Sequence, residues 1–124
     1  MATKKVLIAE DDEAIRRIIK KELETNGIEV FEAGDGEHAL GILMHQHPDL
    51  LLLDVIMPKM HGMDLLRKLR EEEWGKKIPV ILLTNFAEDP RVKEAVKAGH
   101  CELMAKAESR LEDVVKRVKQ RLGK

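Results

Sequence analysis

Apolar and polar positions along the chain follow two different periods. Short, nearly continuous apolar runs, typical of buried strands, occupy residues 5–9, 29–33, 50–53, 79–84 and 102–105. Between these runs, apolar residues recur every three or four positions, as on one face of a helix, over residues 12–27, 37–47, 63–74, 90–99 and 109–122. The pattern predicts a strand followed by a helix, repeated five times.

The helical stripes also predict which side chains face the core. We expect Ile18 on the first helix, Met44 on the second and Leu111 on the last to point inward as members of such stripes. Ser109 and Glu112 have the spacing of a capping box at the start of the last helix. The three stripes comprise Ile15, Ile18, Ile19 and Leu23; Ala39, Leu40, Leu43 and Met44; and Leu111, Val114, Val115, Val118 and Leu122.

Strands that alternate with helices imply an α/β fold, with a parallel sheet covered by helices on both faces. A chain of 124 residues fits one domain. We expect that domain to span residues 1–124, because no linker or low-complexity stretch interrupts the pattern. The alternation is compatible with several orders of the strands in the sheet.

Charge and composition argue against several kinds of partner. With 22 basic and 23 acidic residues, the chain offers no electrostatic reason to expect direct binding to nucleic acid or to a membrane. The single cysteine, Cys101, cannot form an internal disulfide, which suits a reducing compartment. The first residues do not have the pattern of a signal peptide, and no apolar run is long enough to span a bilayer. We therefore expect a cytoplasmic protein.

Polar side chains gather where the predicted strands end. In open α/β sheets, ligands bind beyond the carboxyl ends of the parallel strands. Four of the five strands would deliver polar groups to that edge: Glu10, Asp11 and Asp12 after the first, Asp54 after the third, Thr84 and Asn85 after the fourth, and Lys106 after the fifth. Crowded carboxylates repel one another unless a cation lies among them.

The chemistry of this edge favours Mg²⁺ and phosphoryl transfer. Oxygen ligands without histidine or cysteine suit Mg²⁺. A lysine and a hydroxyl across from Asp54 would complement a dianionic group, and a carboxylate such as that of Asp54 can itself accept a phosphoryl group. Asp12 can instead cap the first helix, where an acidic side chain is favourable.

The order and spacing of these residues resemble the response-regulator receiver domain. The resemblance rests on the acidic residues after the first strand, the "DVIMP" segment that begins at Asp54, Thr84 after the fourth strand and Lys106 after the fifth. It covers essentially the whole chain. It implies a flavodoxin-like three-layer α/β/α sandwich, with a five-stranded parallel sheet in the order 2-1-3-4-5.

The resemblance also implies a role for each matching residue. Asp54 matches the phosphoacceptor, Thr84 the switch hydroxyl, and Lys106 the lysine that binds the phosphoryl group. Asp11 matches the principal carboxylate of a Mg²⁺ cofactor, and Glu10 would act on the metal through water. The full set of matching metal ligands is Glu10, Asp11, Asp54 and the backbone carbonyl of Ile56.

The implied partners are a sensor histidine kinase or phosphotransfer protein, which would donate the phosphoryl group, and a downstream effector or output domain. The fourth helix, fifth strand and fifth helix would form the output surface and a possible homodimer interface. The chain would be a regulator that catalyses only its own phosphorylation and dephosphorylation, and not a metabolic enzyme.

Four positions depart from the pattern of the family, one of them His61, where an acidic or polar residue is frequent before Gly62. Ala107 follows Lys106 where proline is usual, and we expect a trans bond there because a cis bond before alanine costs about 2.5–4 kcal/mol. Asn85 is larger than the residue usual after the switch threonine and would narrow access to the phosphoryl group. Leu103 replaces an aromatic residue of the fifth strand, so we expect the signal to travel mainly through Thr84 and the following helix.

Other functions fit the sequence less well. A phosphohydrolase of haloacid-dehalogenase type needs a second aspartate two residues after the nucleophile, where this chain has Ile56. A flavin carrier of flavodoxin type needs a hydroxyl-rich phosphate loop after the first strand, where residues 10–12 are acidic. The main alternative is a receiver-like module that binds partners without phosphorylation, although the intact set of acidic residues, Thr84 and Lys106 argues against it.

Overall fold

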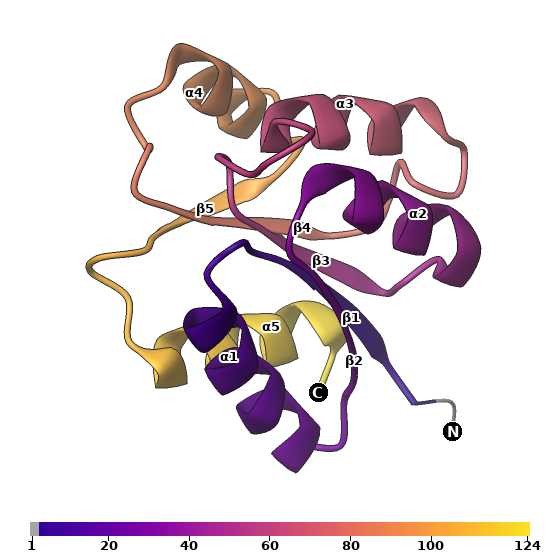
Figure 1. Ribbon diagram of the computed structural model, residues 1–124, viewed down its shortest axis with the longest axis vertical. Coiled ribbons are helices and arrows are strands. Elements are labelled where there is room, and N and C mark those ends of the chain that lie inside the picture. The colour runs from indigo at the N-terminus through magenta and orange to yellow at the C-terminus, as the bar shows by residue number, and fades with distance from the viewer. Residues whose placement is uncertain (1–2) are drawn as a thin grey trace.

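The computed structural model describes residues 3–124, in which five strands alternate with five helices (Figure 1). The strands are β1 (Lys5–Ala9), β2 (Glu29–Ala33), β3 (Leu50–Leu53), β4 (Val80–Thr84) and β5 (Glu102–Ala105). The helices are α1 (Glu13–Thr25), α2 (Gly36–Gln46), α3 (Gly62–Glu71), α4 (Pro90–Lys97) and α5 (Leu111–Leu122). The alternation predicted from the apolar pattern is confirmed. No helix within residues 3–124 has the length and apolar character needed to cross a membrane.

All five strands are parallel, and their order in the sheet is β2-β1-β3-β4-β5. Helices α1 and α5 cover one face, and α2, α3 and α4 lie on the other, which gives three layers (Figure 1). The flavodoxin-like α/β/α sandwich expected from the resemblance is therefore confirmed. Strand β3 lies at the centre between β1 and β4, whereas β5 is an edge strand that pairs with β4 alone.

The four consecutive leucines of β3 supply both cores of the protein. Leu50 and Leu52 pack on the side of α1 and α5, whereas Leu51 and Leu53 pack on the side of α2 and α3. All four are at most 2% exposed. Full burial of one such side chain stabilises a fold by about 1.5–3 kcal/mol. The end of β3, and with it the position of Asp54, is therefore fixed from both faces of the sheet.

Strand β5 is held much less firmly. All four of its residues are half-buried, with Leu103 against the core on the α2–α3 side and Met104 against the other core. The carboxylate of Glu102 accepts a hydrogen bond from Nε of Arg121 on α5 at 3.1 Å. This contact lowers the pKa of Glu102 below its usual value. A charged side chain is a common feature of edge strands, where it discourages pairing with another sheet.

Four predictions about helix orientation and capping are wrong. Ile18 is 55% exposed, Met44 37% and Leu111 36%, so the buried stripes are narrower than the apolar pattern suggests. Helix α5 begins at Leu111, one residue later than a Ser109 cap requires. The acidic residue of the cap is therefore Asp113, whose carboxylate accepts the N–H of Arg110, the residue before the helix, at 3.2 Å.

The predicted cap of α1 is confirmed, because the carboxylate of Asp12 accepts the N–H of Ile15 at 3.1 Å. At the opposite end of the sheet, the ring of Trp74 stacks on that of His47, with centroids 3.9 Å apart and planes 14° apart. His47 ends α2 in a left-handed conformation, with φ of 42°. Trp74 lies just beyond α3 and packs against the core.

Candidate functional site

Two neighbouring strands bring three carboxylates together at the carboxyl edge of the sheet. Glu10 follows β1 and Asp54 follows β3, and the N–H of Asp54 donates to the carbonyl of Ala9 at 2.9 Å. Carboxylate oxygens of Glu10, Asp11 and Asp54 all lie within 4.8 Å of one another. Glu10 and Asp54 are buried, with 4% and 7% exposure, whereas Asp11 is exposed. The sequence therefore predicted correctly that these three residues meet.

Lys106 reaches this cluster from beyond the edge strand β5. Its Nζ lies 3.2 Å from Oδ2 of Asp54 and also forms an ion pair with the carboxylate of Glu10. The Lys106–Ala107 bond is trans, as expected for a position without proline. The lysine thus points at Asp54 without the proline that usually follows it in the family.

The electrostatics of the site leave it with excess negative charge. Burial raises the pKa of Glu10 to about 7, because a carboxylate removed from water loses hydration, and the hydrogen bond from Lys106 offsets only part of this effect. Burial also disfavours the charge of Lys106, but its contacts with Glu10 and Asp54 outweigh that effect and raise the lysine pKa. One cation therefore faces three carboxylates, an arrangement that a divalent metal ion would complement.

Thr84 and Ile56 are the two remaining residues predicted for the site. Thr84 ends β4 and is fully buried, and its hydroxyl accepts the backbone N–H of Phe86 at 3.0 Å. Phe86 itself is 50% exposed. Ile56 follows Asp54 by two residues, with an exposed side chain. The hydroxyl of Thr84 is thus engaged by its own loop, and the part of Ile56 in metal binding stays a prediction.

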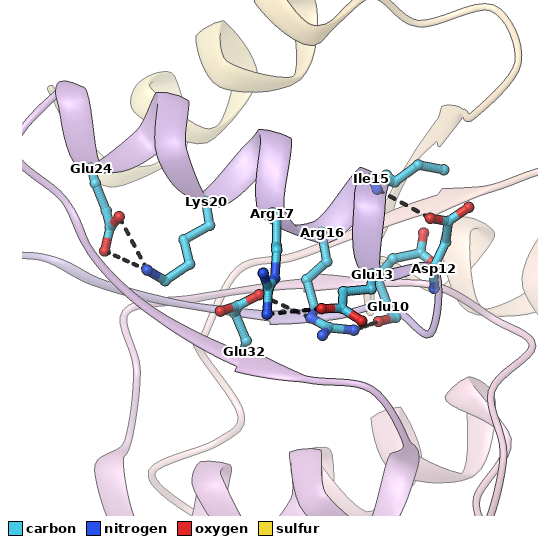
Figure 2. A network of polar contacts seen from close by, with 9 residues as sticks. All are labelled: Glu10, Asp12, Glu13, Ile15, Arg16, Arg17, Lys20, Glu24 and Glu32. Carbon is cyan, nitrogen blue, oxygen red and sulfur yellow. Dashed lines mark hydrogen bonds and ion pairs between the residues drawn. The ribbon is translucent and has the colours of Figure 1, made fainter.

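Arg16 is a residue of the site that the sequence did not reveal. Its Nη1 donates to the backbone carbonyl of Glu10 at 2.8 Å, and its Nε donates to the carboxylate of Glu32 on β2 at 3.0 Å. Figure 2 shows its side chain reaching from α1 to both partners. The guanidinium therefore ties the acidic loop after β1 to the neighbouring strand. In sequence, an arginine on an amphipathic helix is typical of a solvent-facing position, so it gave no signal.

Gly62 is a second residue that the sequence did not reveal. Its N–H donates to the carbonyl of Val55 at 2.7 Å, and a Cβ at this position would lie 2.5 Å from the backbone oxygen of Asp54. Only glycine allows the start of α3 to come this close to the segment that carries Asp54. His61, the residue before it, caps α3 through a hydrogen bond from the N–H of Met63 to its Nδ1.

Comparison with known proteins assigns the chain to a family. Residues 6–119 match the response regulator receiver domain, and the chain belongs to this family. It is thus a receiver domain of two-component signalling, a class of signalling proteins rather than of classical enzymes.

Individual relatives agree with this assignment. The chain is 31% identical to the polar-differentiation response regulator DivK of Brucella ovis over 121 residues, 98% of each protein. It is 33% identical to the probable transcriptional regulator ycf27 of Porphyridium aerugineum over 95% of its own length, but it spans only half of that relative. The receiver domain of the sensor histidine kinase PA1611 from Pseudomonas aeruginosa, solved with magnesium in its active-site cleft, shares the fold with a TM-score of 0.84 and 25% identity over 99% of this chain and 100% of that one.

Proposed function

We propose that Asp54 accepts a phosphoryl group from the phosphohistidine of a sensor histidine kinase or phosphotransfer protein, in a reaction that requires Mg²⁺. One observation carries this proposal: the buried carboxylate of Asp54 lies 3.2 Å from Nζ of Lys106 and within 4.8 Å of carboxylate oxygens of Glu10 and Asp11. A nucleophile flanked by a cation and by candidate metal ligands has the groups that phosphoryl transfer needs.

The residues of the cluster fit Mg²⁺. They offer oxygen donors alone, and their negative charge exceeds that of Lys106. Asp11 and Asp54 would hold the ion directly, together with the backbone carbonyl of Ile56, and Glu10 would act through water. When bound, the metal neutralises charge on the phosphoryl oxygens during transfer.

The side chains of this chain would share the work of the transfer as follows. An oxygen of Asp54 attacks phosphorus, the bond from phosphorus to the donor imidazole nitrogen breaks, and its electron pair stays on that nitrogen. Lys106 exchanges its contact with Glu10 for a phosphoryl oxygen, and the Thr84 hydroxyl turns from the N–H of Phe86 to donate to another. Attack of water on phosphorus later releases inorganic phosphate and restores the carboxylate.

A pocket beside the site supports a protein as the phosphoryl donor. A cavity of about 200 Å³ lies between α1 and α5, lined by Ile15, Ile18, Leu111 and Lys106 among others. Ile18 and Leu111, which were expected in the core, are exposed here. Apolar side chains exposed next to a reactive group suit the docking of a partner that carries the phosphohistidine.

The output of the switch is proposed from the same geometry. Movement of Thr84 toward a phosphoryl group would release the N–H of Phe86 and so alter the loop that leads to α4. The surface formed by α4, β5 and α5 would then carry the signal to an effector or output domain. Dimerisation through this surface, the extent of the domain over residues 1–124 and the cytoplasmic location stay predictions.

The test is mass spectrometry after incubation with Mg²⁺ and acetyl phosphate. We expect the native protein to gain one phosphoryl group, and we expect no gain in Asp54→Asn or after chelation of the metal. Full phosphorylation of Asp54→Asn would show that the assignment of the phosphoacceptor is wrong. A native protein that gains nothing, although it folds and binds Mg²⁺, would favour the partner-binding module that works without phosphorylation.

The docking pocket is tested with a second donor. Ile18→Glu is expected to slow phosphorylation by a phosphohistidine protein while leaving phosphorylation by acetyl phosphate unchanged. Ile18 lies outside the cluster that surrounds Asp54, so an equal loss with both donors would contradict a role in docking.

A further inference from the structure

One hydrogen bond joins the loops that follow Thr84 and Lys106. The side-chain oxygen Oδ1 of Asn85 accepts the backbone N–H of Ala107 at 3.0 Å, although 22 residues separate them in sequence. Asn85 comes directly after Thr84, and Ala107 directly after Lys106. The bond therefore connects the immediate neighbours of two residues of the candidate site.

This bond lies directly beyond the last backbone contact between β4 and β5. The register of the two strands ends with Thr84 opposite Ala105, and the N–H of Lys106 donates to the carbonyl of Thr84 at 2.9 Å. For the next N–H, that of Ala107, Asn85 is the only acceptor found among residues 3–124. The asparagine side chain thus adds a link between the two segments directly after the last backbone hydrogen bond of the ladder.

The additional link is important because Lys106 follows a weakly held strand. Strand β5 pairs with β4 alone, and its four residues are all half-buried. The N–H of Glu108 bonds to the carbonyl of Ala105 at 3.2 Å, a contact within the same loop that does not tie it to β4. The position of the Lys106 side chain over Asp54 therefore depends on how firmly the start of this loop is attached to β4.

We infer that Asn85 is a positioning residue, whose hydrogen bond to Ala107 holds the loop after β5 against the loop after β4 and so keeps Lys106 in reach of Asp54 and its phosphoryl group. This inference rests on the proposed phosphorylation of Asp54. It depends on the backbone N–H at position 107, which proline would lack. If Asn85 were instead an obstacle at the mouth of the site, its removal would speed the reaction.

The test measures the rate of phosphorylation by acetyl phosphate with Mg²⁺ in native protein, Asn85→Ala, Ala107→Pro and the double variant. Asn85→Ala removes the acceptor and Ala107→Pro removes the donor of the same bond. Each is expected to slow the reaction about fivefold, the ratio that corresponds to one ordinary hydrogen bond. The double variant should be no slower than either single variant, because the bond can be lost only once.

Asn26→Ala is the matched control. Asn26 is the only other asparagine in the sequence, and its Oδ1 accepts a hydrogen bond from Nζ of Lys119 at 3.1 Å. It follows the C-terminal end of α1, whereas the site adjoins the N-terminal end. Asn26→Ala should lower the melting temperature without changing the rate, which separates a loss of stability from a loss of positioning.

Hydrogen exchange at the Ala107 amide, followed by NMR, tests the bond apart from the reaction. Exchange should be faster in Asn85→Ala and close to native in Asn85→Asp, which keeps an acceptor oxygen. This measurement decides about the bond even if Ala107→Pro fails to fold. The exchange measurement also remains valid if the native protein is not phosphorylated. That outcome would refute the proposed function and not the hydrogen bond between Asn85 and Ala107.

Three results would overturn the inference. They are a rate in Asn85→Ala that equals or exceeds the native rate, losses that add in the double variant, and exchange at Ala107 that does not respond to Asn85→Ala.

Discussion

Strands β3 and β5 each lead into a residue of the same site, but the protein holds them very differently. Strand β3 pairs on both sides, and its four leucines are buried in two cores before the chain reaches Asp54. Strand β5 pairs on one side only, and its residues are half-buried before the chain reaches Lys106. The carboxylate is fixed by the interior of the protein, whereas the cation that faces it is held by an edge strand and a loop.

This difference teaches which part of the site can adjust. A phosphoryl group on Asp54 would require Lys106 to exchange Glu10 for a new oxygen, and an edge strand with few buried contacts permits such a shift. A comparable movement of Asp54 would require two closely packed cores to rearrange. The arrangement therefore suits a switch in which the phosphorylated residue stays in place and its surroundings move.

The largest expected effect is a loss of unfolding free energy, which we compare between a leucine of β3 and a leucine of β5. Leu52→Ala in β3 should lower the free energy of unfolding by about 3 kcal/mol, because it leaves a cavity in a closed core. Leu103→Ala in β5 should cost less than half as much, since its side chain is only half-buried. Urea denaturation of both variants checks this. Equal losses would show that β5 is packed as firmly as β3.

A second prediction concerns the close approach of α3 to the end of β3. Gly62→Ala should lower the free energy of unfolding by about 2 kcal/mol, because the new Cβ would lie 2.5 Å from the Asp54 backbone oxygen. It should also slow phosphorylation, since the backbone of Asp54 must shift. Gly41→Ala in α2 is the control: beyond the backbone of its own helix and its chain neighbours, no atom lies within 4 Å of its added Cβ. There we expect a gain of about 0.5–1 kcal/mol, as for alanine replacing glycine inside a helix.

A third prediction concerns the pH dependence of stability in metal-free protein. Folded Glu10 keeps its proton up to about pH 7, whereas the unfolded chain loses it near 4.5. The folded state therefore binds more protons in this window, and its stability should fall as pH rises from about 4.5 to about 7. Glu10→Gln should flatten this decline in urea denaturation with EDTA present, whereas Glu108→Gln, at an exposed position, should not. An unchanged slope in Glu10→Gln would contradict the raised pKa.

The smallest expected effect is a change in amide chemical shifts. It distinguishes a signal that passes through Thr84 of β4 from one that passes through Leu103 of β5. Beryllofluoride with Mg²⁺ should shift the amide resonances of residues 92–103 in native protein. Thr84→Ala should remove most of these shifts, because it deletes the hydroxyl that engages Phe86. Leu103→Ala should leave most of them. The reverse outcome would show that the leucine of β5 carries the switch.

The features predicted correctly from the sequence depend on local patterns of residues. The features that were missed depend on how segments that are distant in the chain pack together. The strands and the meeting of Glu10, Asp54 and Lys106 followed from apolar runs and from the geometry of parallel sheets. The strand order came from the resemblance to receiver domains. Ile18 was misplaced because the helical period does not say how wide a stripe the sheet covers.

The wrong cap of α5 and the two missed residues, Arg16 and Gly62, also depend on details of the fold that a local pattern does not contain. The start of α5 differs by one residue from its expected position, so the acidic residue of the capping box is Asp113 and not Glu112. The role of Arg16 depends on the distance from α1 to Glu32, a residue of another strand. The need for glycine at position 62 arises only when α3 is packed against the end of β3.

The stack of Trp74 on His47 has a practical consequence for fluorescence. Trp74 is the only tryptophan of a chain without tyrosine, so nearly all intrinsic emission comes from one ring. His47 precedes β3 and Asp54 follows it, which puts the fluorophore and the carboxylate cluster at opposite ends of the central strand. Tryptophan emission therefore reports unfolding of the α2–α3 side directly, whereas a ligand at the carboxylates would bind at the other end of the strand.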